Sequence, residues 1–186
     1  TRVNSAGIIV SSAANVPRLT YLASGGSPFL LVEPQRTNLV IESNGFQTSA
    51  WSKVGSTAVV PIVTANSVTS PDGNTNAALI EISLIPDGDL SAVNQTFSPI
   101  ADNTTFSLFL RAFDASQVGK KVSLFCNGTS GVTGVVIILS LSFQNFTFNR
   151  TSASNQVFIG KGRTSFPSGG ISQSEMATKF YIYEAQ

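Results

Sequence analysis

The chain has 186 residues, of which 42% are hydrophobic, enough for one domain with a sizeable core. Only 11% are charged, less than half of the roughly 25% typical of globular domains, and 11 Lys and Arg against 10 Asp and Glu leave a net charge of +1. Without clustered basic residues we expect no nucleic-acid partner, whereas a lightly charged surface favours association with other protein chains.

The residue counts also restrict chemistry. The sequence has no histidine, which removes Ser-His and Cys-His nucleophile pairs and the commonest zinc ligand. Its single cysteine excludes an intrachain disulfide. No apolar run reaches the roughly 18 residues that span a membrane, so no membrane partner is expected. The acidic residues stand mostly in turns and match no motif, so we expect no enzymatic activity, no cofactor and no metal.

Residues 1–45 are predicted to form an extended N-terminal arm. Pro17 lacks an N–H group and biases Val16 towards extended geometry. Gly25-Gly26-Ser27-Pro28 has the composition of a turn, and Phe29-Leu30-Leu31-Val32 is short, apolar and extended. The apolar side chains of Tyr21 and of the segment that begins at Phe29 indicate that part of the arm is fixed to a body.

The arm ends in the most specified stretch of the chain, Leu31-Val32-Glu33-Pro34-Gln35-Arg36-Thr37-Asn38-Leu39. Pro34 fixes φ and biases Glu33 towards extended geometry. Arg36 carries five donors, and Asn38 can satisfy backbone groups on both of its sides. A ligand site that uses Glu33, Arg36 and Asn38 is one interpretation. We favour a structural clasp of Glu33, Pro34, Arg36 and Asn38, since apolar residues flank the stretch.

Residues 46–186 show the period-two alternation of β-strands after a short connector with Phe46 and Trp51 as apolar anchors. Alternating segments are predicted at Ala58–Val68, Ala78–Leu84, Ala92–Phe97, Thr105–Phe113, Val122–Cys126, Val135–Phe143, Val157–Ile159 and Lys179–Ala185. Ser70-Pro71-Asp72-Gly73 predicts a turn. A change of apolar phase at Gln144-Asn145 predicts a hairpin turn or a bulge. The fold class is therefore predicted to be all-β, a jelly-roll-like antiparallel β-sandwich preceded by the arm.

Several motifs together resemble a recurrent module of tailed-phage and prophage structural proteins. They are Asn15-Val16-Pro17-Arg18, the nonapeptide Leu31–Leu39, Phe46 with Trp51, Ser70-Pro71-Asp72-Gly73, and Tyr181-Ile182-Tyr183-Glu184-Ala185-Gln186. The resemblance covers nearly the whole chain. It implies a carbohydrate-binding-type β-sandwich in a tail fibre or another appendage of the virion. Other virion proteins and host surface glycans are then the expected partners, and a homo-oligomer, with a trimer favoured, is the expected assembly.

Glycan binding uses aromatic faces against sugar rings and planar polar groups that bind hydroxyls. The candidate ligand-binding residues are Trp51, Phe109, Arg111, Tyr181 and Tyr183, with Phe113 and Phe125 as further rings. Alternation places Phe109, Arg111 and Phe113 on one face of a strand, opposite Leu108 and Leu110. For each ring the alternative is a place in the core, which the anchor position of Trp51 favours. Asp72, Asn74, Asp87 and Asp89 are interpreted as turn residues and not as a calcium site.

These observations predict a bacteriophage virion structural protein, a tail-fibre or appendage component that serves assembly and adsorption to host glycans. Two alternatives stay open. One is a capsid decoration protein whose sandwich braces the shell. The other is a carbohydrate-binding module of a secreted enzyme.

Overall fold

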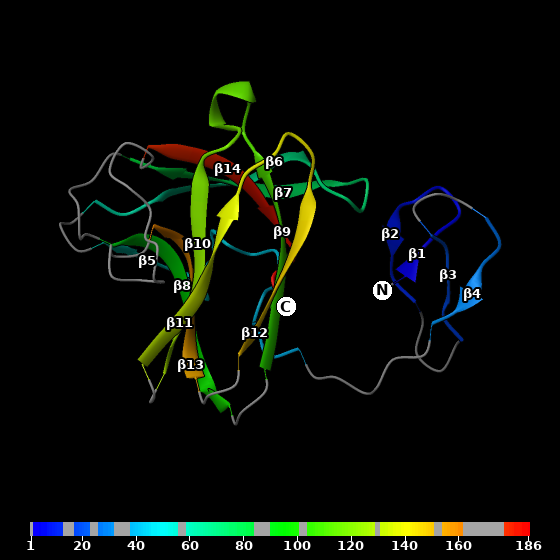
Figure 1. The fold of residues 1–186 in the computed structure, drawn as a ribbon, viewed down its shortest axis with the longest axis horizontal. Coiled ribbons are helices and arrows are strands. Elements are labelled where there is room, and N and C mark those ends of the chain that lie inside the picture. Colours follow the sequence, from blue (N-terminus) through cyan, green and yellow to red (C-terminus); the bar gives the residue numbers. More distant parts are fainter. Residues whose placement is uncertain are drawn as a thin grey trace.

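The computed structural model describes residues 2–12, 17–22, 26–31, 38–55, 59–83, 90–100, 104–128, 131–150, 154–161 and 177–186. Its body is a sandwich of two five-stranded antiparallel sheets, which confirms the predicted fold class (Figure 1). Within these ranges the helical element is η1 (Ala115–Gln117), a single 3-10 turn. Among the described residues no helix has the length and apolar character needed to cross a membrane.

Each sheet is named after one of its strands, β10 or β9. The β10 sheet has the order β11 (Gly131–Ile138), β10 (Lys121–Gly128), β13 (Ser154–Lys161), β8 (Ser91–Ile100) and β5 (Ser52–Gly55). The β9 sheet has the order β12 (Gln144–Arg150), β9 (Thr104–Ala112), β14 (Thr178–Tyr183), β7 (Thr75–Ile82) and β6 (Ile62–Thr69). Apart from the consecutive pairs β10–β11 and β6–β7, neighbouring strands are far apart in sequence, so each face combines residues from distant segments.

The core lies between the sheets and follows the predicted alternation. On β9 the inward positions are Phe106, Leu108, Leu110 and Ala112, and on β10 they are Val122, Leu124 and Cys126. Ile80 and Ile182 add the inward positions of β7 and β14. Because successive side chains of a strand point to opposite faces, burial of this set directs the intervening residues to the outer faces.

The segment Val135–Phe143 differs from its prediction as one strand. β11 ends at Ile138 and lies at the edge of the β10 sheet, whereas β12 begins at Gln144 and lies at the edge of the β9 sheet. Residues 139–143 therefore cross from one sheet to the other, and the phase change predicted as a turn or bulge at Gln144-Asn145 comes from this crossing. Ile137 and Leu139 are both buried, so the crossing keeps an alternation that imitates a continuous strand.

The connector at residues 38–51 is a series of tight turns held to the body. The backbone N–H groups of Gly45, Thr48 and Trp51 donate in turn to carbonyls three residues earlier. Gln95 of β8, only 1% exposed, accepts a hydrogen bond from the Ile41 N–H through Oε1 (2.8 Å) and donates to the Ile41 carbonyl through Nε2 (2.7 Å). This paired contact fixes the connector to the β10 sheet.

The N-terminal arm forms two small ladders beside the sandwich (Figure 1). β1 (Arg2–Val3) pairs with β2 (Ile9–Val10), and β3 (Leu19–Thr20) pairs with β4 (Phe29–Leu30). The ladders are joined by hydrogen bonds between Val3 and the segment 20–21, and the Ile9 N–H donates to the Pro71 carbonyl of the body (3.5 Å). This last contact lies in the predicted turn at residues 70–73, where Gly73 has a positive φ of 84°.

Candidate functional site on the outer face of the β9 sheet

Four of the five candidate ligand-binding residues lie together on the outer face of the β9 sheet. Phe109 and Arg111 come from β9, and Tyr181 and Tyr183 come from β14. The antiparallel register places Tyr181 opposite Arg111 and Tyr183 opposite Phe109. The sequence reasoning grouped the β9 pair by alternation, and the strand order brings the β14 pair next to it.

Arg111 is held between aromatic rings. Its guanidinium carbon lies 5.0 Å from the ring centroid of Tyr181 and 5.6 Å from that of Phe143, within the range of roughly 6 Å for cation–π contact. The one hydrogen bond that Arg111 makes within the described part of the chain runs from Nε to the Ala112 carbonyl (3.5 Å). Its terminal N–H groups therefore remain available as donors in a fixed plane.

Phe113 extends this aromatic surface towards solvent. The residue is 36% exposed, and its ring lies 5.6 Å from the ring of Tyr181, centroid to centroid. The ammonium group of Lys179 lies 5.8 Å from the Phe113 centroid, and Lys179 also pairs with Glu81. An exposed ring beside a planar set of donors is an arrangement that can bind a ligand with both apolar and hydroxyl surfaces.

Tyr183 is buried on the same face and anchored by Asp72. The Tyr183 hydroxyl donates to Oδ2 of Asp72 (3.1 Å), and the Asp72 carboxylate also accepts from the Asn76 amide, the Ser70 hydroxyl and the Asn74 N–H. Burial alone would raise the pKa of the Asp72 carboxyl, but the hydrogen bonds from Ser70, Asn74 and Asn76 outweigh it and hold that pKa far below its ordinary value.

The resulting charge distribution around Tyr183 keeps its hydroxyl neutral. Burial, together with the negative charges of Glu184 and Asp72, raises the pKa of the Tyr183 hydroxyl. The group therefore stays a hydrogen-bond donor, and its ring remains oriented 6.0 Å from the ring of Phe109. The turn at residues 70–73 thus positions an aromatic pair of the candidate site.

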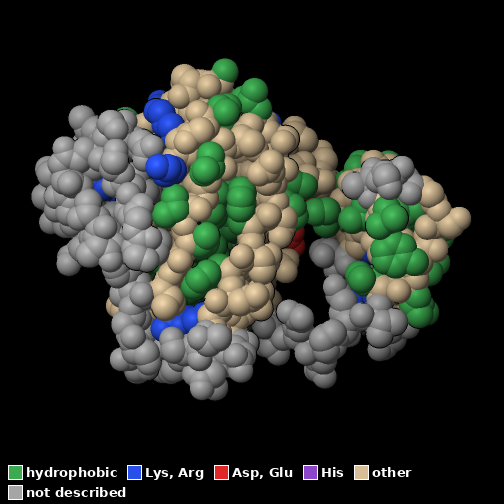
Figure 2. Space-filling view, in the orientation of Figure 1, with side chains coloured by type: hydrophobic (Ala, Val, Ile, Leu, Met, Phe, Trp, Pro, Cys, Tyr) green, Lys and Arg blue, Asp and Glu red, His purple; other side chains and the backbone are tan. Residues whose placement is uncertain are grey.

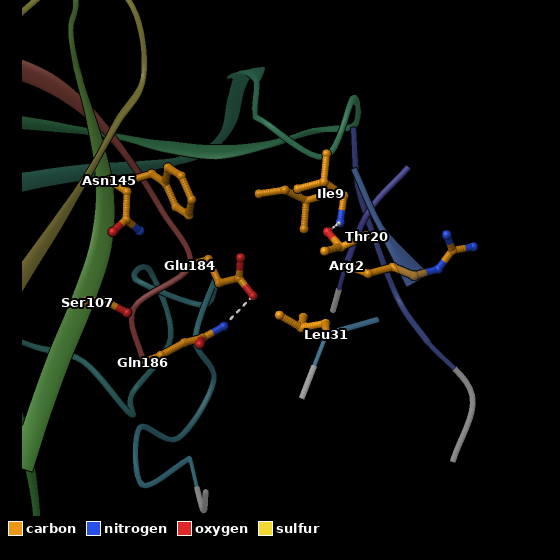
Figure 3. A pocket seen from close by; sticks show the side chains of 10 residues that line it. Arg2, Ile9, Thr20, Leu31, Ser107, Asn145, Glu184 and Gln186 are labelled. Atoms are coloured by element: carbon orange, nitrogen blue, oxygen red, sulfur yellow. Dashed lines mark hydrogen bonds between the residues drawn. The ribbon is translucent and has the colours of Figure 1, made fainter. Parts of the chain in front are cut away.

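A cavity of about 260 Å³ lies between this face and the arm (Figure 3). The body contributes Ser107, Phe109, Asn145, Glu184 and Gln186, and the arm contributes Arg2, Val3, Ile9, Thr20 and Leu31. Figure 3 shows the Glu184 carboxylate directed from the body towards the arm, with Ile9 and Leu31 on the opposite side. Phe109 belongs both to the cavity and to the aromatic surface, so the two are continuous.

Trp51, the fifth candidate, lies in the core. Its side chain is 1% exposed, its ring packs 4.8 Å from that of Phe46, and its Nε1–H donates to the Glu42 carbonyl (3.1 Å). This is the core position that the connector pattern favoured. Phe125 is also buried, stacked on Phe158 in the β10 sheet at 4.8 Å and 2°.

Most of the predicted clasp lies outside the described residues. This applies to Glu33, Pro34 and Arg36. Asn38 is described: its Nδ2 donates to the Ser43 hydroxyl (2.8 Å) and its Oδ1 accepts from the Val40 N–H (3.0 Å), so it stabilises the local chain.

The turn acids form no metal site in the described part of the chain. Asp87 and Asp89 also lie outside the described ranges, and the Asp72 carboxylate is occupied by protein donors. Within those ranges, no group of three or more His, Cys, Asp or Glu side chains is arranged to hold a metal ion.

Sequence reasoning missed several residues of the site. Phe143 ends the alternating segment Val135–Phe143 and is not among the sequence candidates, yet its ring lies 5.6 Å from the guanidinium carbon of Arg111. Ser107, Asn145, Glu184 and Gln186 were not candidates, although all four line the cavity. The alternation of β9 could have identified Ser107 as outward-facing, but no local pattern links the other three to it.

No protein-family model matches this chain, and no curated protein matches it. Among solved structures, the K2 cleaved adhesin domain of Lys-gingipain, a protein from Porphyromonas gingivalis, matches 78% of this chain and 92% of that chain at 9% identity and a TM-score of 0.51. TmCBM61 in complex with beta-1,4-galactotriose matches 80% of this chain and 97% of that chain at 14% identity and a TM-score of 0.49.

The enzymatically active domain of tailspike protein 4 of bacteriophage CBA120 matches 80% of this chain at 13% identity and a TM-score of 0.49. This chain spans 21% of the length of that tailspike chain. The likeness to the adhesin domain agrees with the β-sandwich described above, and at this identity it extends to the fold alone.

Proposed function

We propose that this chain is a component of a bacteriophage tail fibre or appendage that binds glycan on the outer face of the β9 sheet. The observation that carries the glycan binding is Arg111, whose guanidinium plane lies between Phe143 and Tyr181 while its terminal donors remain available. A sugar ring has an apolar C–H surface and a periphery of hydroxyls. The exposed ring of Phe113 fits the first, and Arg111 fits the second.

The cavity under the arm supports binding in preference to hydrolysis. Glycoside hydrolysis ordinarily uses two carboxyl groups on either side of the bond that is cleaved. Among the described residues that line the cavity, Glu184 is the one that carries a carboxyl group. Its neighbours Asn145, Gln186 and Ser107 supply amides and a hydroxyl, which suit recognition of sugar hydroxyls.

Glycan binding is expected to depend on the aromatic surface. We expect Arg111→Ala and Phe113→Ala each to weaken the best glycan found on an array by about 10-fold, equivalent to about 1.4 kcal/mol. Arg111→Lys should recover little, because an ammonium group lacks the planar donor set. Titration calorimetry with each variant measures the change.

Lys53→Ala removes a cation from the edge strand of the other sheet and serves as the control, with unchanged binding expected. An array without any bound glycan would overturn the proposed function. If glycan binding survives both Arg111→Ala and Phe113→Ala, the binding site lies elsewhere on the molecule.

The place in a virion appendage is proposed from the motifs of the phage module and from the surface of the arm. Large apolar side chains of the arm are exposed (Figure 2), namely Leu19, Leu22, Phe29 and Leu30. Exposed apolar clusters of this kind mark contacts with other chains. We therefore propose that the arm contacts other virion proteins or other copies of this chain in a homotrimer.

For the homotrimer, sedimentation equilibrium should give three times the monomer mass. A monomer at high concentration would contradict the trimer.

A further inference from the structure

The cavity between the arm and the β9 sheet has two walls of opposite character. Glu184, Gln186, Asn145 and Ser107 give the wall on the body its polar groups beside the ring of Phe109, and Val3, Ile9 and Leu31 form most of the wall on the arm. Figure 3 shows these two sets facing one another across the opening. A ligand that fills this space must present hydrogen-bonding groups on one side and an apolar group on the other.

The wall on the body carries unused hydrogen-bonding capacity of both kinds. One oxygen of the Glu184 carboxylate accepts from the Gln186 amide, and the other has no partner within the described part of the chain. Asn145 uses its Oδ1 to accept from Thr147, and its Nδ2 donates to none of the described residues. The Ser107 hydroxyl makes no hydrogen bond to the described residues. Hydroxyl groups both donate and accept, so a sugar edge can satisfy this mixture.

The wall on the arm cannot satisfy a further polar group over most of its area. Val3, Ile9 and Leu31 present only hydrocarbon, and the Thr20 hydroxyl, which accepts from the Val3 N–H (3.2 Å), adds a single O–H donor. A hydroxyl pressed against this wall would lose its hydrogen bonds to water without replacement, whereas a methyl group would gain by burial.

The charge of the cavity disfavours acidic sugars. Glu184 supplies a carboxylate, and its half-buried position, which raises the pKa of that group, leaves it less hydrated than a surface acid. Arg2 also lines the cavity, but its guanidinium is directed away from the opening and donates to the Leu19 carbonyl (Figure 3). An anionic ligand would therefore meet the Glu184 carboxylate, while Arg2, the cation among the described residues that line the cavity, is directed elsewhere.

The geometry points to one neutral sugar residue that carries a methyl group, with its hydroxyl edge on Glu184, Asn145 and Ser107 and its methyl group against Ile9 and Leu31. This inference rests on the proposed glycan binding and specifies the sugar at one end of the site. The volume of about 260 Å³ lies just below the range of about 300–1,000 Å³ for small-molecule pockets, which suits one ring. The methyl group belongs to either a 6-deoxy sugar or an N-acetyl sugar, which share this chemistry.

Matched monosaccharides separate the contributions of the methyl group, the hydroxyl group and the negative charge to binding. The methyl glycosides of D-fucose, D-galactose and D-galacturonic acid have the same ring configuration and carry a methyl, a hydroxymethyl and a carboxylate at the same carbon. We expect the fucoside to bind the full chain about 10-fold more tightly than the galactoside, and the galacturonoside not to bind. L-Rhamnose against L-mannose repeats the 6-deoxy comparison, and N-acetylglucosamine against glucose tests the N-acetyl source. Saturation-transfer NMR should show the C6 methyl protons of the fucoside, and not its glycosidic O-methyl protons, nearest the protein.

Two variants test the walls separately. Glu184→Gln should weaken the fucoside and the galactoside alike by about 10-fold, because both lose the same charged acceptor. Ile9→Ser should remove the preference for the fucoside and leave galactoside binding unchanged. Glu42→Gln and Ile138→Ser are controls at exposed positions outside the cavity and should leave both affinities unchanged.

The outcomes distinguish this inference from the proposed function. If methyl-bearing sugars bind no more tightly than their matched partners, the inference is overturned. It is also overturned if glycan binding responds to Arg111→Ala but not to Glu184→Gln or Ile9→Ser, in which case the proposed function stands. If no glycan binds at all, both fail. Thermal unfolding of each variant verifies the fold. If Ile9→Ser disturbs the arm, the effect of Glu184→Gln on the two affinities still tests the inference.

Discussion

Replacement of Trp51 with alanine is expected to lower the free energy of unfolding by about 3–5 kcal/mol. The indole is 1% exposed and packs on Phe46, so truncation removes a large apolar contact and leaves a cavity. It also leaves the Glu42 carbonyl without the hydrogen bond from Nε1. Urea unfolding followed by far-UV circular dichroism measures the loss.

Two comparisons separate this role from ligand binding. Trp51→Phe keeps an aromatic ring in the core and is expected to cost much less, about 1 kcal/mol for the lost hydrogen bond and a further amount for the smaller ring. Glycan affinity of the folded variant should equal that of the wild type. Loss of glycan binding in Trp51→Ala with little change in stability would show that the indole contacts ligand.

Replacement of Asp72 with alanine is expected to cost about 3 kcal/mol, because several donors lose one charged acceptor together. The Ser70 hydroxyl and the Asn74 N–H bind Oδ1, and the Asn76 amide and the Tyr183 hydroxyl bind Oδ2. Of these donors, Tyr183 is the most buried, at 4% exposure, and its unpaired hydroxyl contributes the largest share.

A double-mutant cycle measures how much of this stabilisation comes from the hydrogen bond between Tyr183 and Asp72. Tyr183→Phe removes one donor, and its effect should shrink in the Asp72→Ala background if the two groups interact. Because Tyr183 orients Phe109 at the candidate site, the variants should also alter glycan binding near the cavity. Additive losses of stability in the double variant would contradict the contact.

The contribution of Asp72 is also expected to depend on pH. The pKa of this carboxyl is lowered in the folded chain, so the folded chain binds the proton less readily than the unfolded chain. Its contribution is therefore complete above the ordinary value of 3.8 and is lost as the pH falls below it. Burial raises the pKa of Glu184, so that group acts in the opposite direction: its contribution is present at low pH and lost as the pH rises.

The difference in unfolding free energy between the wild type and Asp72→Asn isolates this effect, since both chains retain Glu184. It should be largest near about pH 6 and shrink as the pH falls below 3.8, because the unfolded chain then binds a proton that the folded carboxyl does not. A difference that is constant over this range would show that the charge of Asp72 does not contribute.

The sequence by itself determined the faces of the strands. Alternation separated Phe109 and Arg111 from Leu108 and Leu110, and it separated Tyr181 from Ile182, because side chains on a strand point to opposite sides with a period of two residues. The same rule identified the core and hence the all-β sandwich. Composition identified Phe46 and Trp51 as anchors of the connector, since isolated aromatic residues in a polar segment gain most from burial.

Only the tertiary structure decided which outward residues meet. Strand order places β14 beside β9. The chain leaves the edge strand β11 of the β10 sheet and crosses at residues 139–143, which brings Phe143 to Arg111 of the β9 sheet. The return of the chain end beside β9 brings Glu184 and Gln186 to Ser107. Such contacts depend on long-range pairing and register, which periodicity does not encode: a pattern shows which side of a strand faces the core, but not which strand lies next to it.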